Sequence, residues 1–361
     1  MHQHKIFNTY PFLFVFILLS SCNGQTKDVQ GSVSVTGEFV SGLDNSIWEI
    51  YQDQNENYWF GSNGNGIYCY DGKKLKLYTE EDGLLSNTIR DIQEDSLGNL
   101  FIGTQRKGVS KYDGNTFTTL KPIRTSLNDW KLEPHDLWFH PDGHIYRYDG
   151  KSLFELKLPR QDLEKAFGIN VSGLNFKGMN SSPYAVYGID QDKAGNLWIG
   201  LIVAGAFRYD GKSFLWIPET ELSTLEDGRV PGVRSLLEDK NGDFWLSNFI
   251  SRYRINEDQG VVAYEKLKGV DTDKYFPDRL PYFNAGLSDQ NGDLWMTTYT
   301  GGVWKLQGNE LLNFPVEDGD TEALIISIYE DRKGVLWIGT DNLGVFKFNG
   351  KTFDKFEPII N

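Results

Sequence analysis

The sequence is poor in the side chains that most often carry covalent chemistry. Its 361 residues include two cysteines, five histidines and three methionines. With only Cys22 and Cys69, the chain lacks the disulfide framework of many small exported domains, so a hydrophobic core must stabilise it. We interpret Cys69, in an alternating apolar stretch, as a core residue. The sequence shows no nucleophile elbow, phosphate-binding glycine loop or zinc-hydrolase motif, and we expect no cofactor.

The sequence also lacks an apolar run long enough to span a bilayer. The run of residues 11–19 is nine residues long, whereas a transmembrane helix needs about 20. This length suits the apolar part of a secretory signal, so we expect residues 1–21 to be a signal peptide. Leu19-Ser20-Ser21-Cys22 resembles the lipobox of bacterial lipoproteins. The resemblance implies lipidation of Cys22 and an exported protein anchored to a membrane, with the outer membrane as the expected one.

Positive charge is scarce as well. Lys and Arg total 36 against 50 Asp and Glu, which gives a net charge of −14. An acidic surface repels phosphate backbones and argues against nucleic acid as a partner. Membrane contact should therefore come from the lipid alone. Residues 22–44 are expected to hold the lipidated Cys22, a polar tether and a strand at 33–40 that pairs with the final blade described next.

What the sequence does contain is a repeat. An apolar-x-x-apolar strand ending in Asp precedes a glycine-containing turn and a strand centred on Trp, as in Ile325 to Asp331 and Trp337. Asp and Gly suit tight turns, and alternating apolar residues mark strands that pack on both faces. The central aromatic position recurs seven times, at Trp59, Phe101, Trp138, Trp198, Trp245, Trp295 and Trp337.

The repeat predicts an all-β fold, a seven-bladed β-propeller of four-stranded antiparallel blades over residues 45–361. Blade three is degenerate, because it lacks the Asp-x-x-Gly turn. We interpret the repeated Trp as packing between blades rather than as binding residues. The blades are expected at about 45–80, 87–121, 127–158, 184–217, 232–267, 282–314 and 324–356.

The run from Thr79 to Asp95, followed by Gly98-Asn-Leu-Phe-Ile-Gly-Thr104, resembles the two-component regulator propeller repeat. Proteins with that repeat include the extracytoplasmic sensor halves of hybrid histidine kinases that respond to glycans. The resemblance covers about residues 45–356. This sequence contains one propeller of repeats with no kinase or DNA-binding segment, so the resemblance implies the fold and does not carry over signalling.

In such a meander, the connections between first and second and between third and fourth strands share one face. The remaining loops and the crossings between blades share the other face and contain the long insertions, which favours that face for binding. The residues just after the start of each inner strand are predicted to line the channel mouth there. Rings and guanidinium groups suit a sugar or an acidic oligosaccharide. These candidates are Trp48, Arg90, Trp130, Tyr187, Arg234 and Asn284.

A second candidate site lies in blade three. His140, Asp142 and His144 flank one loop, and two imidazoles with a carboxylate can bind a transition metal. Pro141-Asp142-Gly143 reads equally well as a tight turn. The acidic turns at 239–243 and 289–293 lack the bidentate Glu of calcium loops and are interpreted as turns.

Three functions remain open on these observations. The leading hypothesis is a non-enzymatic binding lipoprotein whose partner is a glycan, a peptide or a protein. A second is a lyase or hydrolase, similar to the streptogramin lyases in fold, which uses the blade-three histidines and loop carboxylates. Clustering of these histidines in one blade counts against it. The third is a structural component of a membrane assembly.

Overall fold

The computed structural model describes residues 35–106, 108–124, 130–168, 182–222, 232–277 and 281–360. The expected signal peptide, Cys22 and the tether as far as residue 34 lie outside these residues. Within the described ranges, no helix has the length and apolar character needed to cross a bilayer.

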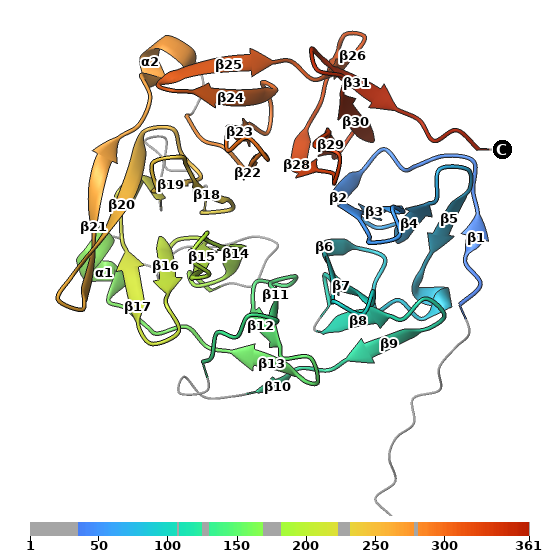
Figure 1. Ribbon diagram of the computed structural model, residues 1–361, viewed down its shortest axis with the longest axis horizontal. Helices are drawn as coiled ribbons and strands as arrows, with labels where there is room; N and C mark the ends of the chain where they lie inside the picture. Colours follow the sequence, from blue (N-terminus) through green and yellow to red (C-terminus); the bar gives the residue numbers. More distant parts are fainter. Residues whose placement is uncertain are drawn as a thin grey trace, which may run out of the picture. The chain divides into compact units, whose positions relative to one another are not determined.

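Seven β-sheets surround one axis, which confirms the predicted seven-bladed propeller (Figure 1). Blade one contains β2 (Ile47–Gln52), β3 (Tyr58–Ser62), β4 (Ile67–Tyr70) and β5 (Leu75–Tyr78), and blade two contains β6 (Ile89–Glu94), β7 (Leu100–Thr104), β8 (Val109–Tyr112) and β9 (Phe117–Leu120). Blade three contains β10 (Ile123–Arg124), β11 (Leu137–Phe139), β12 (Ile145–Tyr148) and β13 (Leu153–Leu156), and blade four contains β14 (Val186–Gln191), β15 (Leu197–Leu201), β16 (Ala206–Tyr209) and β17 (Phe214–Ile217).

The last three blades follow the same order. Blade five contains β18 (Leu236–Glu238), β19 (Asp243–Leu246), β20 (Ser251–Asp258) and β21 (Val261–Lys268), and blade six contains β22 (Ala285–Ser288), β23 (Leu294–Thr297), β24 (Val303–Gln307) and β25 (Glu310–Phe314). Blade seven contains β28 (Ile325–Glu330), β29 (Leu336–Thr340), β30 (Val345–Phe348) and β31 (Phe353–Phe356).

The meander gives the propeller two different faces. The turn face holds the tight connections after the first and third strands, such as Asp53–Asn57 and Asp71–Lys74. Oδ1 of Asp53 accepts the backbone N–H groups of Asn55 and Asn57 at 2.9 Å each, as the predicted turn chemistry requires. The loop face holds the connections after the second strands and the crossings between blades.

The crossings on the loop face carry most of the secondary structure outside the blades. They contain the 3-10 helices η1 (Glu80–Asp82) and η4 (Thr220–Leu222), the helices α1 (Leu163–Phe167) and α2 (Thr272–Tyr275), and the hairpin of β26 (Glu317–Asp318) and β27 (Thr321–Glu322).

The second strands form the core between blades. All five residues of β15 and of β29 are buried, because both faces of each strand lie against a neighbouring blade. Trp337 is 1% exposed and lies with Ile47 and Phe60 in a cluster that joins blade seven to blade one. The ring is thus closed by side-chain packing between two blades, each built from one continuous segment.

The expected closing strand was placed wrongly. β1 (Glu38–Phe39) pairs antiparallel with β5 at the outer edge of blade one, where Phe39 faces Lys76, and not with the final blade. Alternation within residues 33–40 indicates a strand but does not specify which exposed edge it joins.

Blade three departs most from the expected pattern. β11, the strand that carries Trp138, is its innermost strand, and the short β10 pairs parallel with β13 at the opposite edge of the sheet (Figure 1). Within described residues 130–136, no inner strand precedes β11. The chain instead runs past blade four, where the Tyr209 hydroxyl donates to the Trp130 carbonyl at 3.2 Å.

Candidate functional site

Five of the six expected ligand-binding residues lie on the loop face, at or just before the first residue pair of an inner strand. Trp48, Arg90 and Tyr187 are the second residues of β2, β6 and β14. Arg234 lies two residues before β18, and Asn284 is the residue before β22. We call these five residues, together with Asp341 and Tyr299, the loop-face cluster.

Trp130 does not belong to this cluster, contrary to the expectation. It is 7% exposed and packs edge-on against Tyr209 and Phe214, with ring centroids 5.3 and 4.9 Å apart. Its indole N–H donates to the Lys157 carbonyl at 3.0 Å. No inner strand precedes β11 in described residues 130–136, and Trp130, which the repeat aligns with Trp48, packs between blades three and four.

The first part of the cluster joins blades seven, one and two. The Arg90 guanidinium lies 4.0 Å from the Trp48 ring centroid, a cation–π distance. The Trp48 indole N–H donates to Asp341 Oδ1 at 2.7 Å, and the Ser46 hydroxyl donates to the same oxygen at 2.5 Å. Burial lowers the pKa of Arg90 to about 10, while Glu49 and Asp341 oppose the shift.

The second part of the cluster joins blades four and five. The Arg234 guanidinium lies 4.5 Å from the Tyr187 ring centroid. The Tyr282 hydroxyl donates to the Gly232 carbonyl at 2.6 Å, and the Tyr187 ring packs where a side chain at Gly232 would lie. The backbone before β18 is thereby held against two tyrosines.

Tyr299 and Asn284 extend the cluster over blade six. Burial raises the pKa of Tyr299, the charge of Asp341 adds to this shift and the charge of Arg234 opposes it, so Tyr299 is within electrostatic reach of both. Its side chain is 49% exposed. The Asn284 amide donates to the Ile325 carbonyl at 2.9 Å and so connects blades six and seven.

Several of these contacts were missed by sequence reasoning. Asp341, Tyr299 and Asn63 lie in the loops after the second strands of blades seven, six and one, and Asn63 Oδ1 accepts from Arg90 at 3.1 Å. Their position in loops of the favoured face was the available signal. Nothing in the spacing of the repeat shows which loop residue reaches which inner strand.

The blade-three histidines lie on the same face, in the loop between β11 and β12. Burial lowers the pKa of His140 to about 4, so the ring is neutral. Nδ1 of His144 lies 3.2 Å from Asp142 Oδ1, and the Tyr146 hydroxyl donates to Asp142 Oδ2 at 3.0 Å. Among the described residues, no group of three or more His, Cys, Asp or Glu is arranged to hold a metal ion. Metal binding by His140, Asp142 and His144 stays a prediction without structural support.

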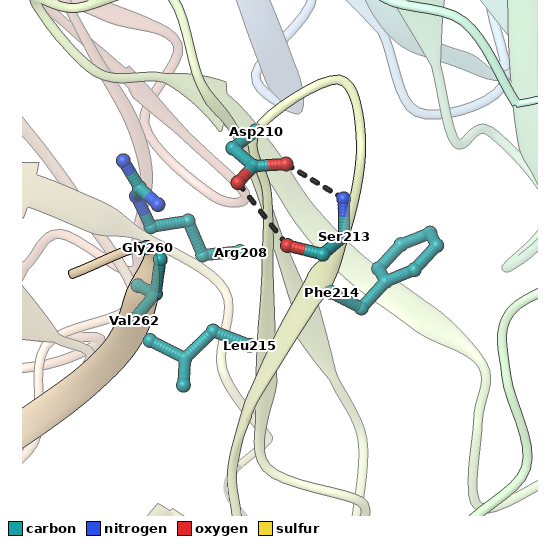
Figure 2. A pocket seen from close by; sticks show the side chains of 7 residues that line it. All are labelled: Arg208, Asp210, Ser213, Phe214, Leu215, Gly260 and Val262. Atoms are coloured by element: carbon teal, nitrogen blue, oxygen red, sulfur yellow. Dashed lines mark hydrogen bonds between the residues drawn. The ribbon is translucent and has the colours of Figure 1, made fainter. Parts of the chain in front are cut away.

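A hollow of about 320 Å³, partly open to solvent, lies elsewhere, between the turn-face ends of blades four and five (Figure 2). Asp210 lines this hollow, and both oxygens of its carboxylate accept hydrogen bonds within the β16–β17 turn, from the Ser213 N–H at 2.7 Å and the Ser213 hydroxyl at 3.1 Å. Arg208 lies within 3.5 Å of Asp192. This hollow is far from the loop-face cluster in the fold, and its polar groups serve the blade itself.

The model of the two component regulator propeller repeat matches the chain at residues 41–64, 83–106 and 320–342. Among curated proteins, none matches the chain in sequence. The first and second matched segments include the start of inner strands β2 and β6, with Trp48 and Arg90.

Solved structures are similar in fold. The extracellular domain of a proposed one component system from B. thetaiotaomicron has a TM-score of 0.55 at 21% identity, over 86% of this chain and 40% of that one. The chain thus spans about two fifths of that domain's length. The extracellular domain of a proposed hybrid two component system from the same organism has a TM-score of 0.53 at 16% identity, over 86% and 40% of the two chains.

A streptogramin B lyase structure has a TM-score of 0.55 at 14% identity, over 88% of this chain and 98% of that one. At these identities the likenesses show the fold alone. The seven sheets establish that the chain is a seven-bladed β-propeller, and its matched segments resemble the two-component regulator propeller repeat.

Proposed function

We propose that the chain is an exported, lipid-anchored binding module whose ligand contacts the loop-face cluster. The observation that supports binding is the presence of two arginine–aromatic stacks on one face, Arg90 on Trp48 and Arg234 on Tyr187, at the start of inner strands from different blades. Rigid strands hold these side chains, while their loops vary, which is a common arrangement for binding sites.

A glycan is the favoured ligand class. Flat rings can cover the apolar faces of sugars, and guanidinium groups can bind carboxylate or sulfate groups. The chain's similarity to the extracellular domains of one component and hybrid two component systems from B. thetaiotaomicron supports a place outside the cytoplasm. Peptide and protein ligands are the alternatives that a binding screen has to separate.

The test of binding is a screen of the purified chain against neutral, uronate-containing and sulfated oligosaccharides and peptides. An Arg90→Ala/Arg234→Ala variant is expected to lose binding of any hit by at least about tenfold, since Arg234 can make charge-assisted contacts and Arg90 holds the Trp48 ring in place. Arg332→Ala, which removes a half-exposed guanidinium from the turn face, is the matched control. Equal binding by the double variant and the wild type would exclude the loop-face cluster as the binding site.

The lipid anchor has its own test. In cells labelled with a palmitate analogue, the wild-type chain and Cys69→Ser are expected to carry label and to sediment with membranes. Cys22→Ser is expected to lose both properties, because acyl chains provide the membrane affinity. Label retained in Cys22→Ser would rule out this anchor without affecting the binding proposal.

A further inference from the structure

The two arginines of the loop-face cluster differ in the partners that their guanidinium groups have within the protein. Arg90 is half-buried, and its guanidinium donates to the Ile89 carbonyl at 3.0 Å and to Asn63 Oδ1 at 3.1 Å while it stacks on Trp48. Both of its terminal nitrogens therefore have protein acceptors. A ligand could use this arginine only by replacing those bonds.

Arg234 is exposed, and no carboxylate lies within ion-pair distance of it in the described ranges. One face of its guanidinium is covered by Tyr187 at 4.5 Å. The guanidinium also interacts with the Tyr282 hydroxyl oxygen. An exposed planar guanidinium that is stacked on an aromatic ring and has no carboxylate partner is well suited to bind a carboxylate or sulfate through charge-assisted hydrogen bonds.

The tyrosines around Arg234 add no negative charge. Burial raises the pKa of Tyr282 to about 12, and burial together with Asp341 raises the pKa of Tyr299, so both phenols are protonated at neutral pH. Within the part of the chain that the structure describes, the half-exposed Tyr299 hydroxyl has no hydrogen-bond partner. An anion at Arg234 would thus meet neutral phenols on this side, of which the Tyr299 hydroxyl is available as a donor, and Asp341 is the acidic group whose charge acts on Tyr299.

The backbone beneath Arg234 is held in a fixed position. Ser247 is 1% exposed and has a φ of 50°, a left-handed conformation that is uncommon for a residue other than glycine. Its hydroxyl oxygen accepts the backbone N–H groups of Arg234 at 2.8 Å and Ser235 at 2.9 Å. A strained, buried residue that fixes the start of a strand is a feature often found at functional sites.

We propose that Arg234, framed by Tyr187, Tyr282 and Tyr299, binds a single carboxylate or sulfate group of the ligand. This inference rests on the proposed function and adds to it that the ligand is acidic and that its anionic group lies over blades four to six. Arg90 contributes by holding Trp48 and the adjacent loop of blade one.

The inference can be tested with three small probes of matched shape: glucuronate, glucose 6-sulfate and glucose. Each is titrated at constant ionic strength into the purified chain, and binding is followed by saturation-transfer NMR. At least one of the acids is expected to bind roughly tenfold more tightly than glucose, the gain of one charge-assisted pair. Comparison of the two acids distinguishes a carboxylate site from a sulfate site.

Arg234→Ala is expected to remove the preference for the acid. Arg234→Lys should keep the charge but retain only part of the preference, because an ammonium lacks the planar fork. Arg332→Ala on the turn face is the control and should behave as the wild type. Circular dichroism and the thermal midpoint check that the exposed Arg234 can be replaced without unfolding.

Absence of any preference for an acid over glucose in the wild type, including absence of binding by all three probes, overturns the inference. So does a preference that survives in Arg234→Ala. If a neutral hit from the oligosaccharide screen is retained by Arg234→Ala but lost by Trp48→Ala/Tyr187→Ala, the proposed function stands while this inference fails.

Discussion

The indole N–H of Trp198 donates a 3.0 Å hydrogen bond to Oδ2 of Asp192, the residue that follows inner strand β14. Oδ1 of the same carboxylate accepts the backbone N–H groups of the tight turn. One aspartate therefore ties together the inner strand, the turn and the Trp that packs between blades. The pair recurs at Asp53–Trp59, Asp239–Trp245, Asp289–Trp295 and Asp331–Trp337, with distances of 2.8, 3.1, 2.9 and 2.9 Å.

Blade three has the Trp without its aspartate. Trp138 is 4% exposed, and its indole nitrogen has no hydrogen-bond partner in the described ranges. Where the pair is present the acceptor is the Asp at the end of the inner strand, and no such strand precedes β11 in described residues 130–136. A different pair stabilises this blade, since the Arg147 guanidinium donates to both oxygens of Asp136 at 2.6 and 3.0 Å.

Replacing Trp by Phe in two blades should separate the contributions of packing and of the indole hydrogen bond to the free energy of unfolding. Trp337→Phe leaves a buried oxygen of Asp331 with one bond fewer and is expected to reduce the free energy of unfolding by about 2–3 kcal/mol. Trp138→Phe removes a donor that has no acceptor and should cost less, about 1 kcal/mol. Urea unfolding followed by circular dichroism measures both, and equal losses would contradict the assigned role of the aspartate.

Gly200 lies where the backbone of the next blade approaches closely. A Cβ at this position would collide with the Val233 carbonyl, which belongs to the backbone of the next blade and cannot move away as a flexible side chain could. Gly200→Ala is expected to destabilise the fold by about 2 kcal/mol or more, as overpacking does. Gly42→Ala, with no atom within 4 Å of its Cβ, is the control and should change the unfolding free energy by less than about 0.5 kcal/mol. A tolerated Gly200→Ala would show that the blades can separate there.

The sequence predicted the fold well because each of the seven copies places several residues at fixed spacing, so the number of blades did not depend on any one residue. Blade three shows the limit. Leu137-Trp-Phe identifies its second strand, but the sequence carries no signal that the first strand is absent, and Trp130 was therefore aligned with Trp48.

The repeat indicates where the inner strands begin but not which side chains pair there. Arg90 and Arg234 occupy equivalent places in the repeat, and the difference between them comes from partners far away in the sequence. Asn63, in a loop of the preceding blade, accepts a hydrogen bond from Arg90. Arg234 instead stacks on Tyr187, interacts with the Tyr282 hydroxyl and is exposed. Repeat spacing fixes where an inner strand starts, but contacts between blades depend on side chains that differ from copy to copy.

The reactivity of the Cys69 thiol tests the interpretation of Cys69 as a core residue. Its side chain is partly buried against the cluster that includes Trp59, and burial raises its pKa to about 12. The thiolate is the reactive form, so the native protein should react with a thiol reagent such as DTNB far more slowly at pH 8 than the urea-unfolded protein does. In a chain with Cys22 replaced by serine, fast labelling under native conditions would contradict the burial of this thiol.

Asp91 gives a test that depends on pH. It follows Arg90 on β6, accepts a hydrogen bond from the Gln93 amide at 3.2 Å, and burial raises its pKa to about 7. Because the folded state binds this proton more tightly than the unfolded chain does, the resulting stabilisation is fully present below the ordinary carboxyl pKa and is lost as the pH rises to about 7. Above that pH the folded protein holds a poorly solvated charge.

Asp91→Asn removes the charge while keeping the size of the side chain. We expect it to raise the free energy of unfolding at pH 8 by on the order of 1 kcal/mol, and to change it much less at pH 5, where Asp91 is mostly protonated in the folded protein. The control is Asp71→Asn, since the turn amides of Lys74 and Lys73 lower the pKa of that exposed carboxyl and it stays ionised at both pH values. Its effect should therefore be the same at pH 5 and pH 8. Urea unfolding at the two pH values measures the difference, and a destabilised Asp91→Asn at pH 8 would show that the charge of Asp91 is stabilised by a partner rather than opposed by burial.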